Sequence, residues 1–225
     1  MSDAMPHDPD QAAEARPDGR SERAQRQREE RRAAILEAAL NVFADKGYHN
    51  ASITDLVQAA GVARGTFYLY FESKSEVFTA LIDELFTRFR STIVGVDTKP
   101  GAPSLTEQLT DRVLAILTAV QGSRAVARVL FREANVLEPE VHVRARGMED
   151  ALLGYLQYSL DNGVRLGLLR VHDTTLAATV MYGSLRQVID RYLLSTADEP
   201  DLHHLAHEVV AVAMRGLHAP TEPAP

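Results

Sequence analysis

Side chains able to bind nucleic acid gather in a short stretch that begins at Arg64. The outer face of this stretch offers Arg64, Thr66, Tyr68 and Tyr70. A guanidinium can donate two hydrogen bonds to a guanine edge, and hydroxyl groups can bind base edges or phosphate oxygens. These residue types within one short segment indicate contact with DNA.

Two short helices and a glycine turn would position these side chains. A helix is predicted from Ser52, because Asp55 stands three residues on and completes a capping box, and Gly61 ends the helix. After the turn, Phe67 and Phe71 can anchor the second segment to the preceding helices. This is the pattern of a helix-turn-helix, in which apolar residues fix the angle between helices and polar residues meet DNA.

A first helix is predicted from Arg28 to Lys46, because apolar residues recur at helical spacing and Gly47 follows as a C-terminal cap. Residues 1–27 lack such spacing and are predicted to form a flexible arm. Near its end, arginines outnumber glutamates. Two interpretations stay open: a solvated helix start, or an arm that touches phosphates or enters a minor groove. The arginines are Arg20, Arg23, Arg26, Arg28, Arg31 and Arg32, and the glutamates are Glu22, Glu29 and Glu30.

The stretch from Ser52 to Phe71, followed by Ser73 and Lys74, resembles the sequence that marks the TetR family of bacterial transcriptional regulators. The resemblance covers about residues 30–90. Arg64 is the best candidate for sequence specificity, Leu69 could pack on a thymine methyl, and Tyr68 keeps an alternative role in the core. The resemblance implies phosphate contacts at Ser52 and Thr54, base contacts at Arg64, Gly65, Thr66 and Leu69, and contacts with the DNA backbone at Tyr68, Tyr70 and Lys74.

Two residues depart from the family pattern. Ala63 stands where a serine is common, so the recognition helix would lack a side-chain cap, at a cost of about 1 kcal/mol. Val57 replaces a common alanine where the two helices approach each other. Both departures bear on the fine geometry of DNA contact.

The rest of the chain is predicted to be helical. Ser73 and Glu76 form a second capping box, which opens a long amphipathic helix that runs to about Val94. A linker rich in glycine and proline follows at 95–103, and further helices are predicted near 105–120, 126–133, 148–163, 174–194 and 202–217. We therefore expect an all-α fold with an arm at 1–27, a helix-turn-helix DNA-binding domain at 28–72, and an effector-binding and dimerisation domain at 73–220, whose residues 73–94 form the connecting helix.

Composition narrows the class of protein. The chain of 225 residues has no cysteine, so it has neither disulfides nor thiolate metal sites. Its start lacks the apolar core of a signal peptide, and its apolar runs are far shorter than the roughly 18 residues of a membrane span, so we expect a cytoplasmic protein. A net charge of −7 argues against indiscriminate coating of nucleic acid, so any DNA binding must be local.

A homodimer is expected, because single helix-turn-helix modules make few contacts and bind palindromic half-sites in pairs, roughly 34–36 Å apart. The last two helices are the predicted interface. The final one is apolar on more than one side, and Gly183 and Ser184 in the preceding one would allow close helix approach. The family resemblance implies the same interface, and ordinary packing within one chain is the alternative.

The resemblance also implies a pocket for a small effector between the middle helices, and its apolar candidates favour a lipophilic or aromatic molecule. The effector would bind the conformer whose recognition helices are wrongly spaced, with the long helix transmitting the difference. Arg124, Arg128 and Arg132 form a row that could meet a ligand anion, although a solvated face is favoured. No cofactor is expected. The lining candidates are Phe86, Phe89, Leu117, Leu130, Phe131, Tyr155, Tyr158 and Tyr182.

Other classes fit the sequence less well. His203, His204, His207 and Glu208 lie close together, but the residue order of the zinc-protease motif and a further distant ligand are missing. No nucleophile elbow, phosphate-binding loop or dinucleotide fingerprint occurs, so we do not expect an enzyme. The alternatives to a repressor are an activator with the same motif and a non-enzymatic helical protein that binds a partner.

Overall fold

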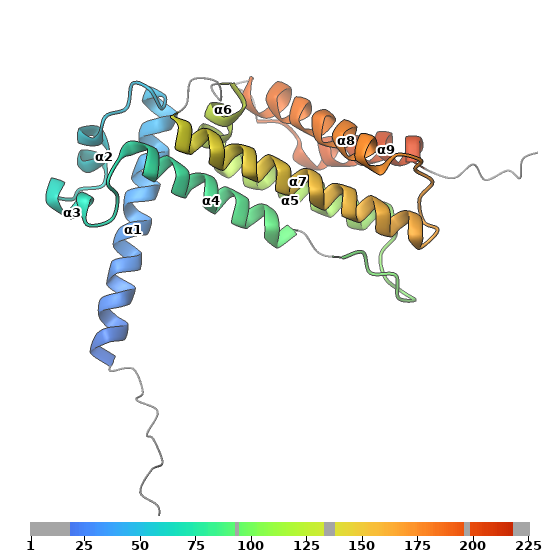
Figure 1. Cartoon of the computed structure of the whole chain (residues 1–225), viewed down its shortest axis with the longest axis horizontal. Helices are drawn as coiled ribbons and strands as arrows, with labels where there is room; N and C mark the ends of the chain where they lie inside the picture. The colour runs from blue at the N-terminus through green and yellow to red at the C-terminus, as the bar shows by residue number, and fades with distance from the viewer. Residues whose placement is uncertain (1–18, 93–94, 133–137, 196–198, 218–225) are drawn as a thin grey trace, which may run out of the picture.

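The computed structural model describes residues 19–92, 95–132, 138–195 and 199–217, and all regular structure within these ranges is helical (Figure 1). The predicted all-α fold is therefore confirmed. The elements are α1 (Gly19–Lys46), α2 (Ile53–Ala59), α3 (Arg64–Tyr68), α4 (Lys74–Thr92), α5 (Leu105–Gly122), α6 (Arg124–Arg132), α7 (Pro139–Arg165), α8 (Thr174–Val188), the π-helix η2 (Ile189–Leu194) and α9 (Leu202–Leu217).

Helix α1 begins at Gly19 rather than at Arg28, so the predicted flexible arm is wrong for residues 19–27. Most residues of this stretch are Arg, Glu, Gln and Ala, which are strong helix formers, and no proline interrupts them. Gln25 also donates to Glu29 across one turn, at 2.7 Å. Apolar periodicity missed these turns because residues 22–34 are exposed and face no core. Residues 1–18 of the predicted arm lie outside the described residues.

The helix-turn-helix forms as predicted, with α2 packed against α1 and α3 beside α2. Gly47 ends α1 with φ of +75°, and Gly61 makes the turn between α2 and α3 with φ of +61°. A side chain would be strained in this left-handed region, which explains glycine at both positions. Leu56, Phe67 and Phe71 are buried and hold the unit together.

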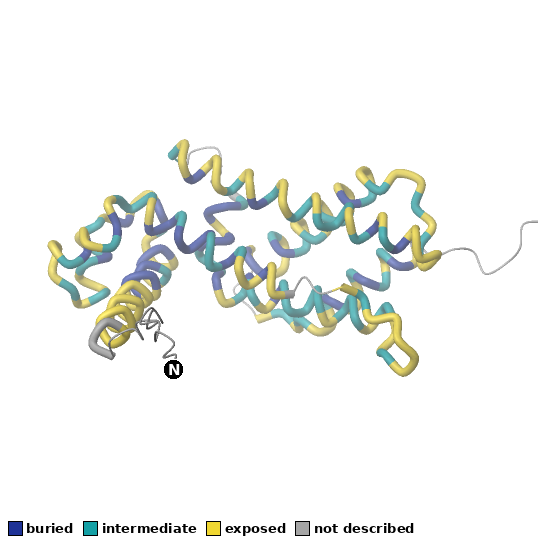
Figure 2. The backbone as a smooth tube through the Cα atoms, turned by 60° about the horizontal axis from the view of Figure 1, so that its bottom comes forward, coloured by how far each residue is buried: buried dark blue, intermediate teal, exposed yellow. Residues whose placement is uncertain are grey.

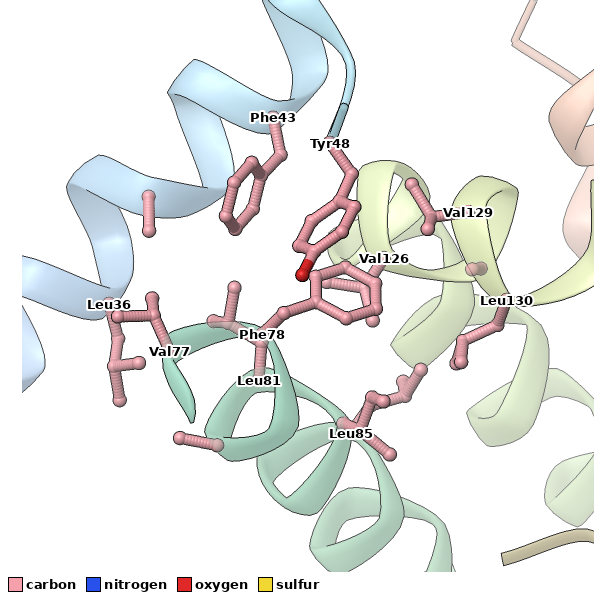
Figure 3. Packing of buried hydrophobic residues seen from close by; sticks show 14 of the residues in the cluster. Leu36, Phe43, Tyr48, Val77, Phe78, Leu81, Leu85, Val126, Val129 and Leu130 are labelled. Atoms are coloured by element: carbon pink, nitrogen blue, oxygen red, sulfur yellow. The ribbon is translucent and has the colours of Figure 1, made fainter. Parts of the chain in front are cut away.

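An aromatic cluster joins the helix-turn-helix to the rest of the molecule (Figure 3). The rings of Phe43, Tyr48 and Phe78 have centroids 4.7 to 5.7 Å apart. Val126 and Leu130 of α6 are buried in the same cluster. One hydrophobic core therefore runs from α1 through α4 and α6 to α7 and η2.

The larger part of the molecule is a helical bundle. Helix α9 packs along α5, α8 packs along α7, and α4 contacts both α5 and α7. Burial is uneven, because α4 buries most of its apolar residues, whereas those of α5 and α7 are mostly half-buried (Figure 2). No single helix in the described ranges is long and apolar enough to cross a membrane, and the two that reach that length and composition together, α5 and α6, are bent by 94°.

Several helix ends differ from the predicted ones. The predicted stop at Asn162 and Gly163 is wrong, because α7 continues to Arg165 and the left-handed residue is Gly167, with φ of +72°. Gly163 instead lies close to Leu169, because a Cβ there would lie 2.6 Å from Leu169 Cδ1 and would force that side chain to move. Helix α4 ends at Thr92, and the predicted helix from 174 to 194 is formed by α8 and η2 together. Val94 and Glu133 lie outside the described residues.

Candidate nucleic-acid interface

The N-terminus of α2 is fixed by a capping box and an ion pair. Ser52 Oγ accepts from the Asp55 N–H at 3.2 Å, and Asp55 Oδ2 accepts from the Ser52 N–H at 2.9 Å. Lys46 Nζ donates to Asp55 Oδ1 at 2.6 Å. The bonds from Lys46 and Ser52 hold the pKa of Asp55 well below its usual 3.8. The predicted capping box is confirmed, and the ion pair ties the end of α1 to the start of α2.

The two predicted phosphate contacts on α2 differ in their surroundings. Thr54 is exposed, so its hydroxyl can approach a phosphate from solvent. The Ser52 hydroxyl already donates to Asp55 Oδ2 at 2.7 Å. A phosphate at Ser52 would therefore have to compete with that carboxylate, or be bound by the free backbone N–H groups of the first turn.

The segment formed by α3 and the residues directly after it exposes Arg64 and Leu69 and buries two phenylalanines. Phe67 and Phe71 are 0% and 2% exposed, and their ring centroids lie 6.0 Å apart. Arg64 is exposed and Leu69 is 71% exposed. The guanidinium of Arg64 lies 5.9 Å from the ring centroid of Tyr68. The recognition segment therefore exposes both a cation and a large apolar side chain, the two types that can contact base edges.

The other predicted contacts of the recognition helix lie around this face. Gly65 is exposed with open space beside it, Thr66 is half-buried, and Tyr68 is 44% exposed, which rules out the alternative of Tyr68 as a core residue. Tyr70 is half-buried and packs against the core. As predicted, Ala63 stands at the N-cap of α3 without a side-chain hydrogen bond.

Lys74 is placed differently from its predicted role at the DNA backbone. Its ammonium donates to the carbonyl oxygens of Tyr48, His49 and Ala51 at 2.8, 3.4 and 3.1 Å. It also lies 4.4 Å from the centroid of the Tyr48 ring. These contacts use all three ammonium donors, so Lys74 would reach a phosphate only by leaving the loop between α1 and α2.

A hydrogen bond that sequence reasoning missed connects this unit to α7. Tyr48 is fully buried, and its hydroxyl donates to Glu138 Oε2 at 2.7 Å. Burial and the Glu138 carboxylate raise the pKa of Tyr48. Glu138 stands at the N-cap of α7, yet its side chain does not cap that helix. Ninety residues separate the two partners, so no local pattern could have indicated the contact.

The predicted pocket residues fall into three groups. Phe89, Leu117 and Leu130 are buried core residues. Phe86, Phe131, Tyr155 and Tyr182 are half-buried, and burial together with Glu149 raises the pKa of Tyr182 to about 12. Tyr158 is 65% exposed, so it lies outside any buried lining of α7.

Of the charged residues singled out in the sequence, Arg128 on α6 and the three histidines on α9 are exposed. Arg128 is exposed and reaches the carbonyl of Leu194 at 3.5 Å, whereas the side chain of Arg132 lies outside the described residues. His203, His204 and His207 are exposed on α9, and His207 Nδ1 lies 3.2 Å from Glu208 Oε1. In the part of the chain that the structure describes, no three side chains form a metal-binding group.

A hollow of about 680 Å³ lies along α8 and contains the predicted small residues Gly183 and Ser184. Val180 and Tyr192, at its two ends, are 58% and 48% exposed. On α9, Val212 is 68% exposed, while Ala206, Val210 and Met214 are buried. The last two helices therefore carry apolar side chains that this chain alone leaves in solvent.

Comparison with known proteins agrees with this geometry. A family model described as bacterial regulatory proteins of the tetR family matches residues 35–81, and one described as a tetracyclin repressor-like C-terminal domain matches residues 102–217. The HTH-type transcriptional regulator YdgC of Bacillus subtilis is 30% identical over 84% of this chain and 93% of its own.

Two further relatives carry more informative names. The fatty acid metabolism regulator protein of Bacillus subtilis is 25% identical, over 82% of this chain and 94% of its own. The solved structure of the fatty acid degradation regulator FadR from Bacillus halodurans is 26% identical, with a TM-score of 0.68 over 83% of this chain and 95% of that one. Because family models match both the DNA-binding unit and the helical bundle, this chain belongs to the TetR family of bacterial transcriptional regulators.

Proposed function

We propose that this protein binds a palindromic operator as a homodimer, represses transcription, and is released by a small lipophilic molecule. The observation that carries the proposal is the exposure of Arg64 and Leu69 on a segment that Phe67 and Phe71 anchor in the core. Arg64 would donate to a guanine edge, and Leu69 would pack on a thymine methyl. The role is regulatory rather than enzymatic, and it is exerted on chromosomal DNA in the cytoplasm.

The DNA proposal is tested by selecting bound duplexes from a random pool and measuring their affinity at stated salt concentrations. A palindromic site is expected. Arg64→Ala should weaken binding by about 1–3 kcal/mol for each half-site and relax preference at one position of each half-site. Arg90→Ala, at an exposed arginine near the far end of α4, is the matched control. Failure to select any palindrome would overturn the proposal, and a reporter assay separates repression from activation.

The homodimer is proposed to form through α8 and α9. Leu176, Val180 and Val212 are each more than half exposed, and Gly183 and Ser184 leave room for a helix of the partner to approach. Burying such side chains in a second copy removes apolar surface from water, at roughly 25 cal/mol per Å². A two-fold axis at this interface would pair two recognition helices for a palindrome.

The effector is proposed to be a long-chain fatty acyl molecule that occupies the space between α4, α5, α7 and α8. Apolar residues of these helices are only half-buried in this chain: Phe86, Val113 and Leu152 at the edge of the core, and Tyr155 on α7. Two relatives are named as regulators of fatty acid metabolism or degradation. An acyl chain would complete the burial of these residues. Phe86 lies on α4, whose N-terminus follows α3, so the helix can carry a change to the recognition helix.

Calorimetry with stearoyl-CoA, stearic acid and coenzyme A distinguishes the parts of such a molecule. At least one acyl compound should bind and lower operator affinity, whereas coenzyme A alone should do neither. Leu152→Gln should weaken acyl binding, and Val143→Gln, at a 71% exposed position of the same helix, should not. If acyl compounds bind free and operator-bound protein equally, the proposed release mechanism fails, because linkage requires different affinities.

A further inference from the structure

The N-terminal turns of α1 extend beyond the packed body of the molecule (Figure 1). Every side chain from residue 22 to residue 34 is exposed, and Figure 2 shows this part of α1 in the colour of exposed residues. Packing in this chain therefore does not account for these turns, and a helix end without tertiary contacts is only marginally stable in water.

One side of these turns carries arginines without glutamates. With 100° of rotation per residue, Arg28, Arg31 and Arg32 fall within an arc of about 100°. Glu22, Glu29 and Glu30 fall within a similar arc of about 100°, centred roughly opposite the first, and Arg23 and Arg26 also lie on that opposite side. The helix thus has a basic side that carries arginines without glutamates, while the opposite side carries charges of both signs.

The basic side is the one that faces the DNA-reading unit. The guanidinium of Arg32 lies 5.3 Å above the centroid of the Phe71 ring, and Phe71 follows directly after α3. Arg28 precedes Arg32 by about one helical turn, so it lies about 6 Å further along the same side. Arg28 and Arg32 therefore lie on the side of α1 that faces the segment following α3.

We infer that Arg28 and Arg31 form a second DNA-contacting surface, which binds phosphates flanking the base pairs read by α3. The inference rests on the proposed operator binding. A polyanionic backbone fits exposed arginines that have no glutamate on their side of the helix, in a chain whose net charge is −7. Phosphate contacts of this kind strengthen binding to all sequences without specifying any.

The test compares Arg28→Gln/Arg31→Gln with wild-type protein on a selected operator duplex. Each lost phosphate contact should reduce the slope of log affinity against log salt by about 0.9, so a dimer of the double variant, which loses such contacts in both protomers, should lose roughly 3.6. Hydroxyl-radical footprints should shrink at the flanks, while the preferred base sequence stays the same. Arg23→Gln/Arg26→Gln, which removes two arginines from the opposite side, is the matched control, and circular dichroism checks that α1 remains helical.

An unchanged slope and footprint in the double variant would overturn the inference while leaving operator binding established. An equal loss in Arg23→Gln/Arg26→Gln would also overturn it, because the effect would then come from charge and not from one side of α1. If wild-type protein selects no operator, the proposed function itself fails, and this outcome is distinct from both others.

Discussion

The ammonium group of Lys74 holds together the loop between α1 and α2 through three carbonyl oxygens. Lys74→Met should therefore destabilise the protein by about 1–3 kcal/mol, since the carbonyls lose a charged donor in a partly buried site. Urea unfolding should show a lower midpoint at an unchanged slope. Lys99→Met, at an exposed position between α4 and α5, should have little effect. If Lys74→Met had normal stability but bound DNA more weakly, Lys74 would instead bind a phosphate of the DNA backbone.

Asp55 should make stability sensitive to acid. Its pKa lies below the usual 3.8 in the folded protein because of Lys46 and Ser52, so the unfolded chain binds a proton first as pH falls. The stabilisation is present above about pH 4 and is lost as pH drops below it toward the depressed value. Asp55→Asn should flatten the fall in stability in this range, as measured by urea unfolding. Asp111→Asn, at an exposed carboxylate on α5, should leave the curve unchanged.

At the scale of elements, the bond between Tyr48 and Glu138 couples the loop after α1 to the start of α7. A double-mutant cycle with Tyr48→Phe and Glu138→Gln should give an interaction energy of about 0.5–3 kcal/mol in the stability of the protein. The same cycle with the exposed Glu140→Gln is the control. An interaction energy near zero would show that the two elements are held only by the surrounding apolar packing.

Local signals decided which elements could be predicted. Ser52 and Asp55 marked the start of α2, and Gly47 and Gly61 marked turns, because each acts within a few residues. The exposed start of α1 was not predicted, because a helix that faces only solvent has no periodic apolar residues. The role of Lys74 depends on carbonyls more than twenty residues away, which no local pattern reveals. The outward positions of Arg64 and Leu69 followed once Phe67 and Phe71 were assigned to the core.

At the scale of the whole molecule, the proposed dimer depends on exposed apolar residues of α8 and α9. Val180→Glu or Val212→Glu would place a charge in the interface, which should shift the protein to monomers and weaken operator binding. Sedimentation at several stated concentrations measures the change. Val143→Glu introduces the same charge at a 71% exposed site on α7 and should leave the dimer intact. Dimers of unchanged affinity in both interface variants would contradict this interface.

The continuous core around Phe43, Tyr48 and Phe78 means that the helix-turn-helix and the helical bundle cannot be exchanged independently between proteins. A fragment that ends after α3 would lose Phe78 and Val126 and would leave the Tyr48 ring in water, so it should not fold alone. Calorimetry of the intact chain should accordingly show one cooperative transition. A functional chimera that carries a different sensor would need to retain the packing surface of α4 and α6, and not the helix-turn-helix alone.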